Sequence, residues 1–192
     1  MAEVDGADGE LAPWERLAGQ RLWDGLPLLA MDRERWRQMR SGREGNFYRC
    51  HMPSWVQIVP VDEDGERLIL VRQFRFGMGK FSLETPGGAI EPGESPLAAA
   101  QREFLEETGY GARSWQSLAS LHPFPAFCDN LLHVFLATGC RRVSEQHLDP
   151  FEEVAVVTRP MGEVYAELSA GKLSPVHVAV ALLLAKERLG LS

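Results

Sequence analysis

The chain has 192 residues, of which 45% are hydrophobic and 24% are charged, a composition typical of globular proteins. This length suits one domain with a small extension, and such a domain buries roughly 70% of the surface that its unfolded chain exposes. The 27 acidic residues outnumber the 20 basic ones and give a net charge of −7, which excludes general attraction to nucleic acid or an anionic membrane. No apolar run reaches the about eighteen residues of a transmembrane helix.

The N-terminus and the cysteines indicate the compartment. Residues 1–12 are acidic, small and without periodicity, so we expect them to be disordered. A secretory signal would instead be basic and then apolar, which favours a cytoplasmic protein. Cys50, Cys128 and Cys140 are odd in number and widely spaced, so they predict neither a disulfide framework nor a zinc site.

The first part of the chain carries weak signals. Residues 14–29 place apolar side chains at mixed spacing between glycines, and we expect a short helix followed by an edge strand. The charged stretch 33–45 predicts a strand or a short helix that ends in a surface turn. We therefore interpret residues 1–44 as an N-terminal extension, in which the apolar content of 14–29 is compatible with a dimerisation surface.

Clearer β-strand signals follow. Two β-type apolar runs, 56–59 and 68–71, bracket an Asp-Gly turn and predict a hairpin. The run 81–84 predicts a short strand that a Pro-Gly-Gly sequence ends. Later strands are expected at 118–121, 131–137 and 154–157.

The most regular helix signal begins at Ser95, a natural N-cap that is followed by proline at the first helical position. Residues 97–107 are strong helix formers, and Gly109 is placed as the C-terminal stop. Two further helices are expected at 161–169 and 176–189. Because helices and strands are interspersed without a regular βαβ repeat, the sequence predicts a mixed α+β fold.

Three glutamates of the first helix, Glu103, Glu106 and Glu107, share one face because they are spaced i, i+3 and i+4. Like charges repel at this spacing, and Arg102 relieves only part of the repulsion. Glu94 adds a carboxylate just before the helix. Hard cations such as Mg²⁺ and Mn²⁺ bind arrays of carboxylate oxygens, although a solvated acidic helix face is the alternative.

The spacing around these glutamates decides between the two interpretations. Gly88 is followed by five residues, Glu94, seven residues, and Arg102-Glu103-Phe104-Leu105-Glu106-Glu107-Thr108-Gly109-Tyr110. This segment resembles the Nudix box, G-x5-E-x7-R-E-U-x-E-E-x-G-U, where U is a bulky apolar residue, and every fixed position matches. Phe104 and Tyr110 place aromatic rings at the two U positions, where aliphatic residues are commoner.

The likeness covers about residues 45–188 and points to one branch of the superfamily. The segments 73–77 and 83–88 are similar to the lead-in of ADP-ribose and nucleotide-sugar pyrophosphatases, and Pro125 lies where that branch has a proline after the box. The resemblance implies a Nudix domain over 45–192, an α/β/α sandwich with a mixed β-sheet, and a loop-helix-loop catalytic motif. It also implies a homodimer whose N-terminal segments complete each other's sites.

Roles for individual residues follow from the resemblance. The implied metal ligands are Glu103, Glu106, Glu107, Glu152 and the Gly87 carbonyl, with Arg102 and Glu94 orienting the cluster. The implied catalytic carboxylates are Glu106, Glu107, Glu152 and Glu153. The general base is one of Asp149, Glu152 and Glu153, because the loop that carries them aligns poorly.

Substrate contacts are expected at Arg72, Arg75, Glu84, Trp55, Pro125 and Phe127. The guanidinium groups of Arg72 and Arg75 suit phosphate oxygens. Trp55 and Phe127 could each stack on a nucleobase, although core packing is the commoner role for such residues.

The implied reaction is metal-dependent hydrolysis of the diphosphate linkage of ADP-ribose or a related nucleoside diphosphate sugar, which gives a nucleoside monophosphate and a sugar phosphate. Two or three Mg²⁺ ions, or Mn²⁺, would neutralise the diphosphate and lower the pKa of a bound water. One alternative is cleavage of nucleoside triphosphates or dinucleoside polyphosphates, which Pro125 disfavours. The other is a non-catalytic nucleotide sensor, which the complete box and the lack of a basic helix-turn-helix segment disfavour.

Overall fold

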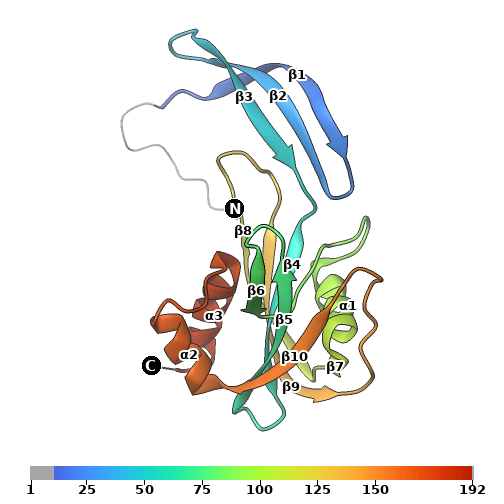
Figure 1. Cartoon of the computed structure of the whole chain (residues 1–192). Helices are drawn as coiled ribbons and strands as arrows, with labels where there is room; N and C mark the ends of the chain where they lie inside the picture. The colour runs from blue at the N-terminus through green and yellow to red at the C-terminus, as the bar shows by residue number, and fades with distance from the viewer. Residues whose placement is uncertain (1–10, 192) are drawn as a thin grey trace. The chain divides into compact units, whose positions relative to one another are not determined.

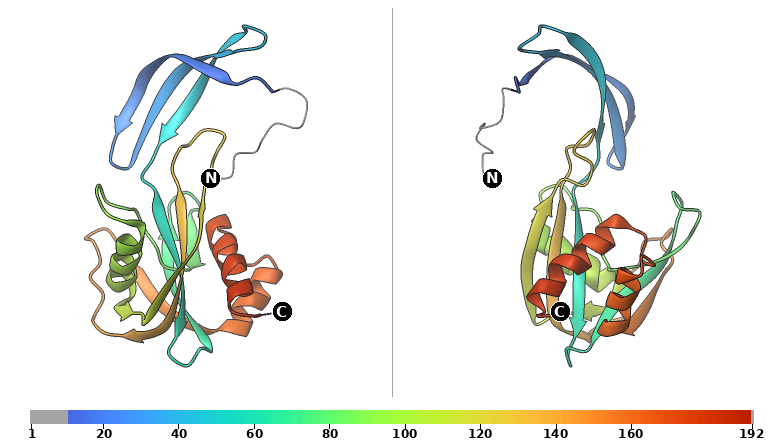
Figure 2. Two further views of the ribbon diagram at one scale, coloured as in Figure 1. Left: turned by 180° about the vertical axis from the view of Figure 1, so that it is seen from behind. Right: turned by 90° about the vertical axis from the view of Figure 1, so that its left-hand side faces the viewer.

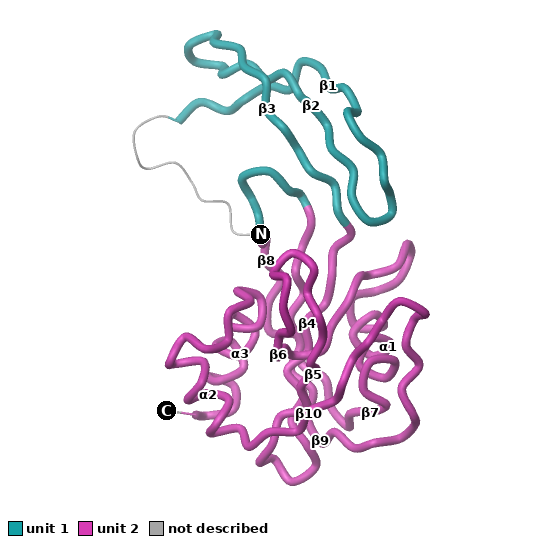
Figure 3. Tube along the Cα trace, in the orientation of Figure 1, with its two compact units in different colours: residues 1–52, 124–129 teal, residues 53–123, 130–192 magenta. Residues whose placement is uncertain are grey.

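The computed structural model describes residues 11–191. Most of the segment expected to be disordered, residues 1–10, therefore lies outside the described residues. The chain forms two compact units, coloured separately in Figure 3. The first holds the chain up to Met52 together with residues 124–129, and the second holds residues 53–123 and 130–192. The expected division at residue 44 falls where β3 begins, and the assignment of 45–192 to one Nudix domain stays a prediction.

The first unit contains an antiparallel sheet of order β1-β2-β3 (Figure 1), built from β1 (Trp14–Gly25), β2 (Leu29–Gln38) and β3 (Glu44–His51). The predicted helix at 14–29 is wrong, because β1 is a strand that pairs with β2 along its length. Hydrogen bonds from β2 outweigh the helix propensity of the Glu, Leu, Ala and Gln residues in this segment. The predicted edge strand and the strand alternative for 33–45 are confirmed.

The second unit is built on a mixed sheet of order β10-β5-β4-β9-β7, with β6 on β5 and β8 on β9. β4 and β9 are parallel, and the other pairs are antiparallel. The strands are β4 (Trp55–Asp62), β5 (Arg67–Arg75), β6 (Lys80–Glu84), β7 (Tyr110–Gly111), β8 (Ser114–Leu121), β9 (Leu132–Arg142) and β10 (Val154–Pro160). The helices are α1 (Pro96–Thr108), α2 (Met161–Ser169) and α3 (Val176–Arg188).

Helices cover both faces of this sheet (Figures 1 and 2). On one face, Phe104, Ala99 and Ala100 of α1 pack against β4, β5 and β9. On the other face, Leu182 of α3 and Val164 of α2 pack against the same strands. The α/β/α sandwich with a mixed sheet is therefore confirmed, and each helix layer is stabilised by burial of its apolar stripe.

The described helices were compared with the length and hydropathy of a membrane-spanning helix. Across residues 11–191, no helix combines the length and the apolar content needed to cross a bilayer.

Candidate active site

Capping interactions at Ser95 and Gly109 set the two ends of helix α1. Ser95 has extended backbone angles, and its hydroxyl accepts a hydrogen bond from the Ala98 N–H at 3.2 Å. Gly109 has φ 73° and donates its N–H to the Leu105 carbonyl at 2.8 Å. Residues with side chains rarely adopt this left-handed conformation, so glycine ends the helix and directs the chain into β7.

The loop before α1 is held against β4. The Val56 N–H donates to the Gly88 carbonyl at 2.9 Å, and the Ile58 N–H donates to the Pro86 carbonyl at 2.9 Å. β4 pairs with β5 only at Val61, next to their connecting turn, so most of this edge of β4 is available to the loop. A side chain at Gly87 would collide with the Val56 carbonyl, and one at Gly88 would collide with the Glu103 carboxylate. Gly87 is therefore required for the loop to lie against β4, because its clash is with backbone, whereas a side chain at Gly88 would displace the Glu103 carboxylate.

Glu107 is the most buried carboxylate of α1. Its side chain is only 5% exposed and accepts a hydrogen bond from the Gly87 N–H at 2.9 Å. Burial, reinforced by the charges of Glu103 and Glu152, raises the pKa of Glu107 to about 8 despite this hydrogen bond. Burial also raises the pKa of Glu103, and the charges of Glu106 and Glu152 add to that effect. The repulsion shows that Glu152 lies within electrostatic range of both α1 carboxylates.

One guanidinium group organises the rest of the cluster. Arg102 donates from Nε and Nη2 to Glu94 at 3.0 and 2.9 Å, and from Nη1 to Glu103 at 2.9 Å and Glu106 at 3.0 Å. Its remaining Nη2 donor binds the Ala89 carbonyl at 2.9 Å. All five donors of the guanidinium are thus engaged. Glu94, followed by Glu103 and Glu106, raises the pKa of Arg102 above its usual value.

The loop before β10 carries the candidate general bases. Glu152 accepts a hydrogen bond from the Asp149 N–H at 3.2 Å, and its own N–H donates to the Asp149 carbonyl at 2.9 Å. Glu152 and Glu153 both line a cavity of about 780 Å³, whereas Asp149 does not. Because only Glu152 of the three also acts on the pKa values of Glu103 and Glu107, it is best placed among the candidates.

An ion-paired arginine lines the same cavity. Arg75 donates from Nε and Nη2 to the two carboxylate oxygens of Glu84, at 3.0 and 2.7 Å. Glu84 is fully buried, and His177 Nε2 lies 3.4 Å from its Oε2. Burial alone would raise the pKa of Glu84, but bonds from His177 and Arg75 lower it to about 2. His177 is a cavity residue that sequence reasoning missed, because nothing near it in the sequence indicates that α3 begins beside β6.

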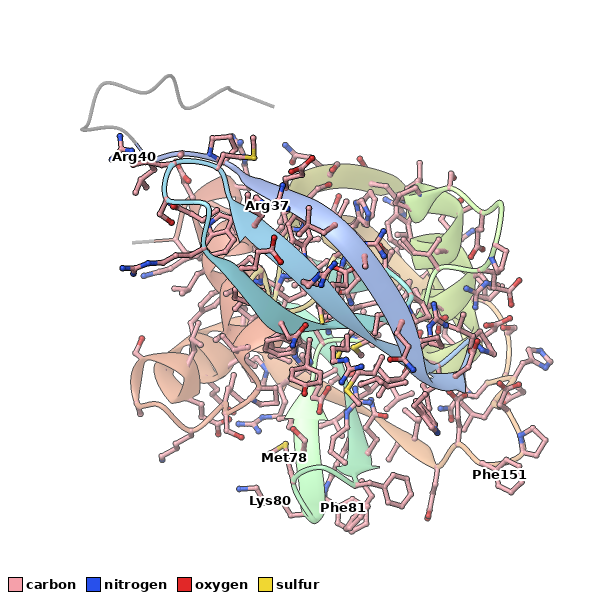
Figure 4. All side chains as sticks on the ribbon, turned by 90° about the horizontal axis from the view of Figure 1, so that it is seen from above. Arg37, Arg40, Met78, Lys80, Phe81 and Phe151 are labelled. Carbon is pink, nitrogen blue, oxygen red and sulfur yellow. The ribbon has the colours of Figure 1, made fainter. Side chains whose placement is uncertain are left out.

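Aromatic and apolar side chains from the β5–β6 hairpin form the rim of this cavity. Figure 4 shows Met78, Lys80 and Phe81 around the hairpin turn and Phe151 on the loop before β10. The Arg72 guanidinium lies over the Phe81 ring, 4.9 Å from its centroid, and Arg72 itself is exposed. Arg72 is therefore a neighbour of the cavity residue Phe81, and it is not itself among the residues that line the cavity.

The three remaining predicted residues lie elsewhere. Trp55 is partly buried and packs against the core beneath α2 and α3, as the core-packing alternative expects. Pro125 and Phe127 belong to the first unit, where they line a cavity of about 440 Å³ with Trp14, Trp36 and other residues of its sheet. Phe127 stacks on Phe124 there, with 5.7 Å between the ring centroids.

The second unit thus brings together Glu94, Arg102, Glu103, Glu106, Glu107 and the Gly87 loop. In residues 11–191, no group of three acidic, histidine or cysteine side chains is already arranged around a common ion position. The donor chemistry nevertheless fits a hard divalent cation. Burial, and then neighbouring like charges, raise the pKa values of Glu103 and Glu107, and added positive charge would stabilise their ionised forms.

Comparison with known proteins agrees with this geometry. Residues 52–177 match the family described as NUDIX domain. The chain is 37% identical over 124 residues to the ADP-ribose pyrophosphatase of Bacillus subtilis, covering 63% of this chain and 66% of that protein. It is 31% identical over 132 residues to the ADP compounds hydrolase NudE of Escherichia coli, covering 69% of each chain.

A solved structure supports the fold over almost the whole length. The crystal structure of an ADP compounds hydrolase superposes with a TM-score of 0.82 at 25% identity, covering 95% of this chain and 97% of that one. The family match spans most of the chain and includes β4, the loop, α1 and the cavity. Together with the complete box on α1, this match shows that the chain belongs to the Nudix family and is a Nudix hydrolase.

Proposed function

We propose that the protein hydrolyses the diphosphate linkage of ADP-ribose or a related nucleoside diphosphate sugar, releasing a nucleoside monophosphate and a sugar phosphate. Two matched relatives carry the names ADP-ribose pyrophosphatase and ADP compounds hydrolase. The observation that carries the proposal is the buried Glu107 beside Glu103 and within electrostatic range of Glu152 and Arg75, an arginine that lines the cavity and suits phosphate.

The metal requirement follows from the carboxylate cluster. Divalent ions bound here, in our proposal two or three Mg²⁺ with Mn²⁺ as a substitute, would neutralise the diphosphate and lower the pKa of a bound water. Glu103, Glu106, Glu107, Glu152 and the Gly87 carbonyl would be their ligands. Arg102 holds two of these carboxylates, Glu103 and Glu106, and Glu94 in turn binds Arg102.

The remaining site residues would bind the substrate and move a proton. Glu152 would accept the proton of the attacking water, with Glu153 of the same cavity as the second candidate. Arg75 uses one donor each of Nε and Nη2 to bind Glu84, so the two Nη1 donors and the second Nη2 donor are left for a phosphate oxygen. Arg72 would contribute charge at the rim. We assign Pro125 and Phe127, which line the cavity of the first unit, as candidate contacts for the nucleoside, and we assign Trp55 to core packing.

We also propose that the enzyme is a cytoplasmic homodimer that uses the β1–β3 sheet as its interface. The sheet exposes large apolar side chains, among them Trp23 at 50% and Tyr48 at 58%, and the β1–β2 turn exposes Leu28 at 74%. Exposed apolar groups gathered on one small sheet are typical of an association surface. Light scattering after gel filtration tests the dimer, and a mass of one chain, 21.4 kDa, would contradict it.

The reaction is tested with a hydrolysis panel in Mg²⁺ that contains ADP-ribose, ADP-, GDP- and UDP-sugars, NADH, a diadenosine polyphosphate and nucleoside triphosphates. We expect preferential release of AMP from ADP-ribose or an ADP-sugar. Glu107→Gln should abolish this release, because the amide removes the charge but keeps the shape. Glu187→Gln, on the exposed surface of α3, is the matched control and should retain full activity.

The panel also separates the alternatives. Preferential cleavage of triphosphates or of the dinucleoside compound would replace the proposed substrate class. Folded protein that is inactive on the whole panel with Mg²⁺ and with Mn²⁺ would contradict the proposed hydrolysis and favour a nucleotide-binding role.

A further inference from the structure

Cys50 and Cys128 are far apart in the sequence but adjacent in the first unit. Cys50 lies near the end of β3, and Cys128 lies in the 124–129 segment. The two residues form a parallel β-bridge, and the Cys50 N–H donates to the Phe127 carbonyl at 2.7 Å.

The backbone pairing meets the Cα separation that a disulfide requires. Residues paired across neighbouring strands have Cα atoms about 4.8 Å apart, and their side chains leave the same face. Disulfides span Cα separations of about 4.4–6.8 Å. The separation of the two Cα atoms therefore lies within the range that a disulfide spans.

Polar contacts to Asp129 from the residues on either side of Cys50 keep the two segments together. Arg49 donates to Asp129 at 2.7 Å, and His51 Nδ1 lies 3.3 Å from the same carboxylate. These residues flank Cys50 and Cys128 in the sequence. The cysteines are thus held in register by their neighbours.

The two thiols differ in access. Cys128 is only 7% exposed, and burial together with the neighbouring Cys50 raises the pKa of its thiol. Cys50 is partly exposed. A reagent from solution would therefore reach Cys50 first, and Cys128 would react second, from inside the unit.

We propose that Cys50 and Cys128 form a reversible dithiol–disulfide site that low-molecular-weight disulfides oxidise. The Cys50 thiolate attacks the reagent, RSSR, breaking its S–S bond, forming a mixed disulfide and releasing one RS⁻. The Cys128 thiolate then attacks the Cys50 sulfur, forms the protein disulfide and releases the second RS⁻. The two protein thiols lose two electrons and two protons, which reduce RSSR to two RSH.

The bond would fix the segment that carries Pro125 and Phe127 onto β3. The site does not depend on the reaction proposed above, since neither cysteine belongs to the carboxylate cluster. Cys140 is an internal control, because it is buried in the core of the second unit, where burial raises its pKa to about 12.

The test uses the reduced full chain with excess oxidised glutathione, followed by alkylation in denaturant, intact mass and a non-reducing peptide map. We expect two of the three thiols to be lost, one linked peptide pair that joins Cys50 to Cys128, and a free Cys140. The melting temperature should rise by about 5 °C or more and return to its starting value with dithiothreitol.

Single variants identify the order of attack. Cys128→Ser should stop at a glutathione adduct on Cys50, Cys50→Ser should leave Cys128 unmodified, and Cys140→Ala should still form the bond. Three persistent thiols, wild-type protein that stops at the mixed disulfide, or bonds between two chains would each overturn the proposal. The peptide map of the wild-type chain decides the question even if a variant does not fold.

Discussion

At the scale of single residues, the carboxylates of the site differ in whether an arginine neutralises them. Arg102 uses every donor of its guanidinium on Glu94, Glu103, Glu106 and a backbone carbonyl. The Glu107 carboxylate has no such partner, and among the hydrogen bonds of the described residues it accepts one from the Gly87 N–H alone. One arginine therefore orients the carboxylates at the rim of the cluster, while the most buried carboxylate retains the strongest need for a cation.

Arg102→Lys tests this division of roles. Lysine keeps the positive charge but cannot reproduce the five directed bonds, so Glu103 and Glu106 would lose their orientation. We expect kcat/KM and the apparent affinity for Mg²⁺ to fall about 10–100-fold, the range for residues that orient metal ligands. Steady-state kinetics over a Mg²⁺ titration measure both effects. Unchanged affinity for Mg²⁺ in the folded variant would contradict the orienting role.

Glu84 predicts a pH dependence of stability. Its pKa is lowered from 4.5 to about 2 in the folded protein, so its ionised form stabilises the fold above about pH 4.5, and this contribution is lost as the pH falls toward 2. Glu84→Gln removes the contribution. We expect the variant to be destabilised at pH 7 and to approach wild type as the pH falls from 4.5 to 2. Urea unfolding at several pH values measures this gap, and a gap independent of pH would contradict the assignment.

At the scale of elements, the position of α1 depends on close backbone approach. The loop at Gly87 and Gly88 bonds to β4 and leaves no room for side chains between β4 and Glu103. The helix start at Ser95 and its end at Gly109 then determine which glutamates face the loop. The loop fixes the position of the helix because Gly87 lies against Val56 of β4 and Gly88 lies against the Glu103 carboxylate of α1.

Two alanine substitutions of glycine separate this steric role from a general effect on helices. Gly88→Ala would push against the Glu103 carboxylate, and we expect at least a tenfold loss of kcat in a folded protein. Gly162→Ala, near the start of α2, meets open space and should stabilise the protein by about 0.5 kcal/mol with unchanged kcat. Kinetics and thermal unfolding of both variants measure the contrast. Full activity of Gly88→Ala would contradict the steric argument.

At the scale of the whole molecule, the sheet of the second unit separates two apolar layers, and only one of them supports the carboxylate cluster. Phe104 of α1 is fully buried and contacts Trp115, with 6.0 Å between their ring centroids. Leu182 of α3 is equally buried in the layer on the opposite face. Packing in the α1 layer therefore both stabilises the folded protein and positions Glu103, Glu106 and Glu107.

A matched pair of cavity-forming substitutions tests this asymmetry. Phe104→Ala should cost about 3–5 kcal/mol and Leu182→Ala about 2–5 kcal/mol of unfolding free energy. We expect Phe104→Ala also to lower kcat under conditions where it stays folded, whereas Leu182→Ala should keep nearly normal kcat. Denaturant unfolding and kinetics on the same samples provide the comparison, and equal kcat values for the two variants would contradict a special role for the α1 layer.

Features that depend on neighbours in the chain were determined by the sequence itself. Ser95, Pro96 and Gly109 predict the bounds of α1, because caps and left-handed stops act within a few residues. The spacing of Glu103, Glu106 and Glu107 predicts a shared face for the same local reason. The β4–β5 hairpin and the mixed α+β class follow from turn chemistry and hydrophobic periodicity, and both are confirmed.

Only the tertiary structure decided the features made by distant segments. β1 is a strand because β2 supplies its hydrogen bonds, although its own residues favour a helix. The meeting of His177 with Glu84 and of Cys50 with Cys128 depends on packing between segments that no local pattern connects. Local propensity acts over a few residues, whereas strand pairing and burial join residues from anywhere in the chain, and these long-range contacts created the cavity and the cysteine pair.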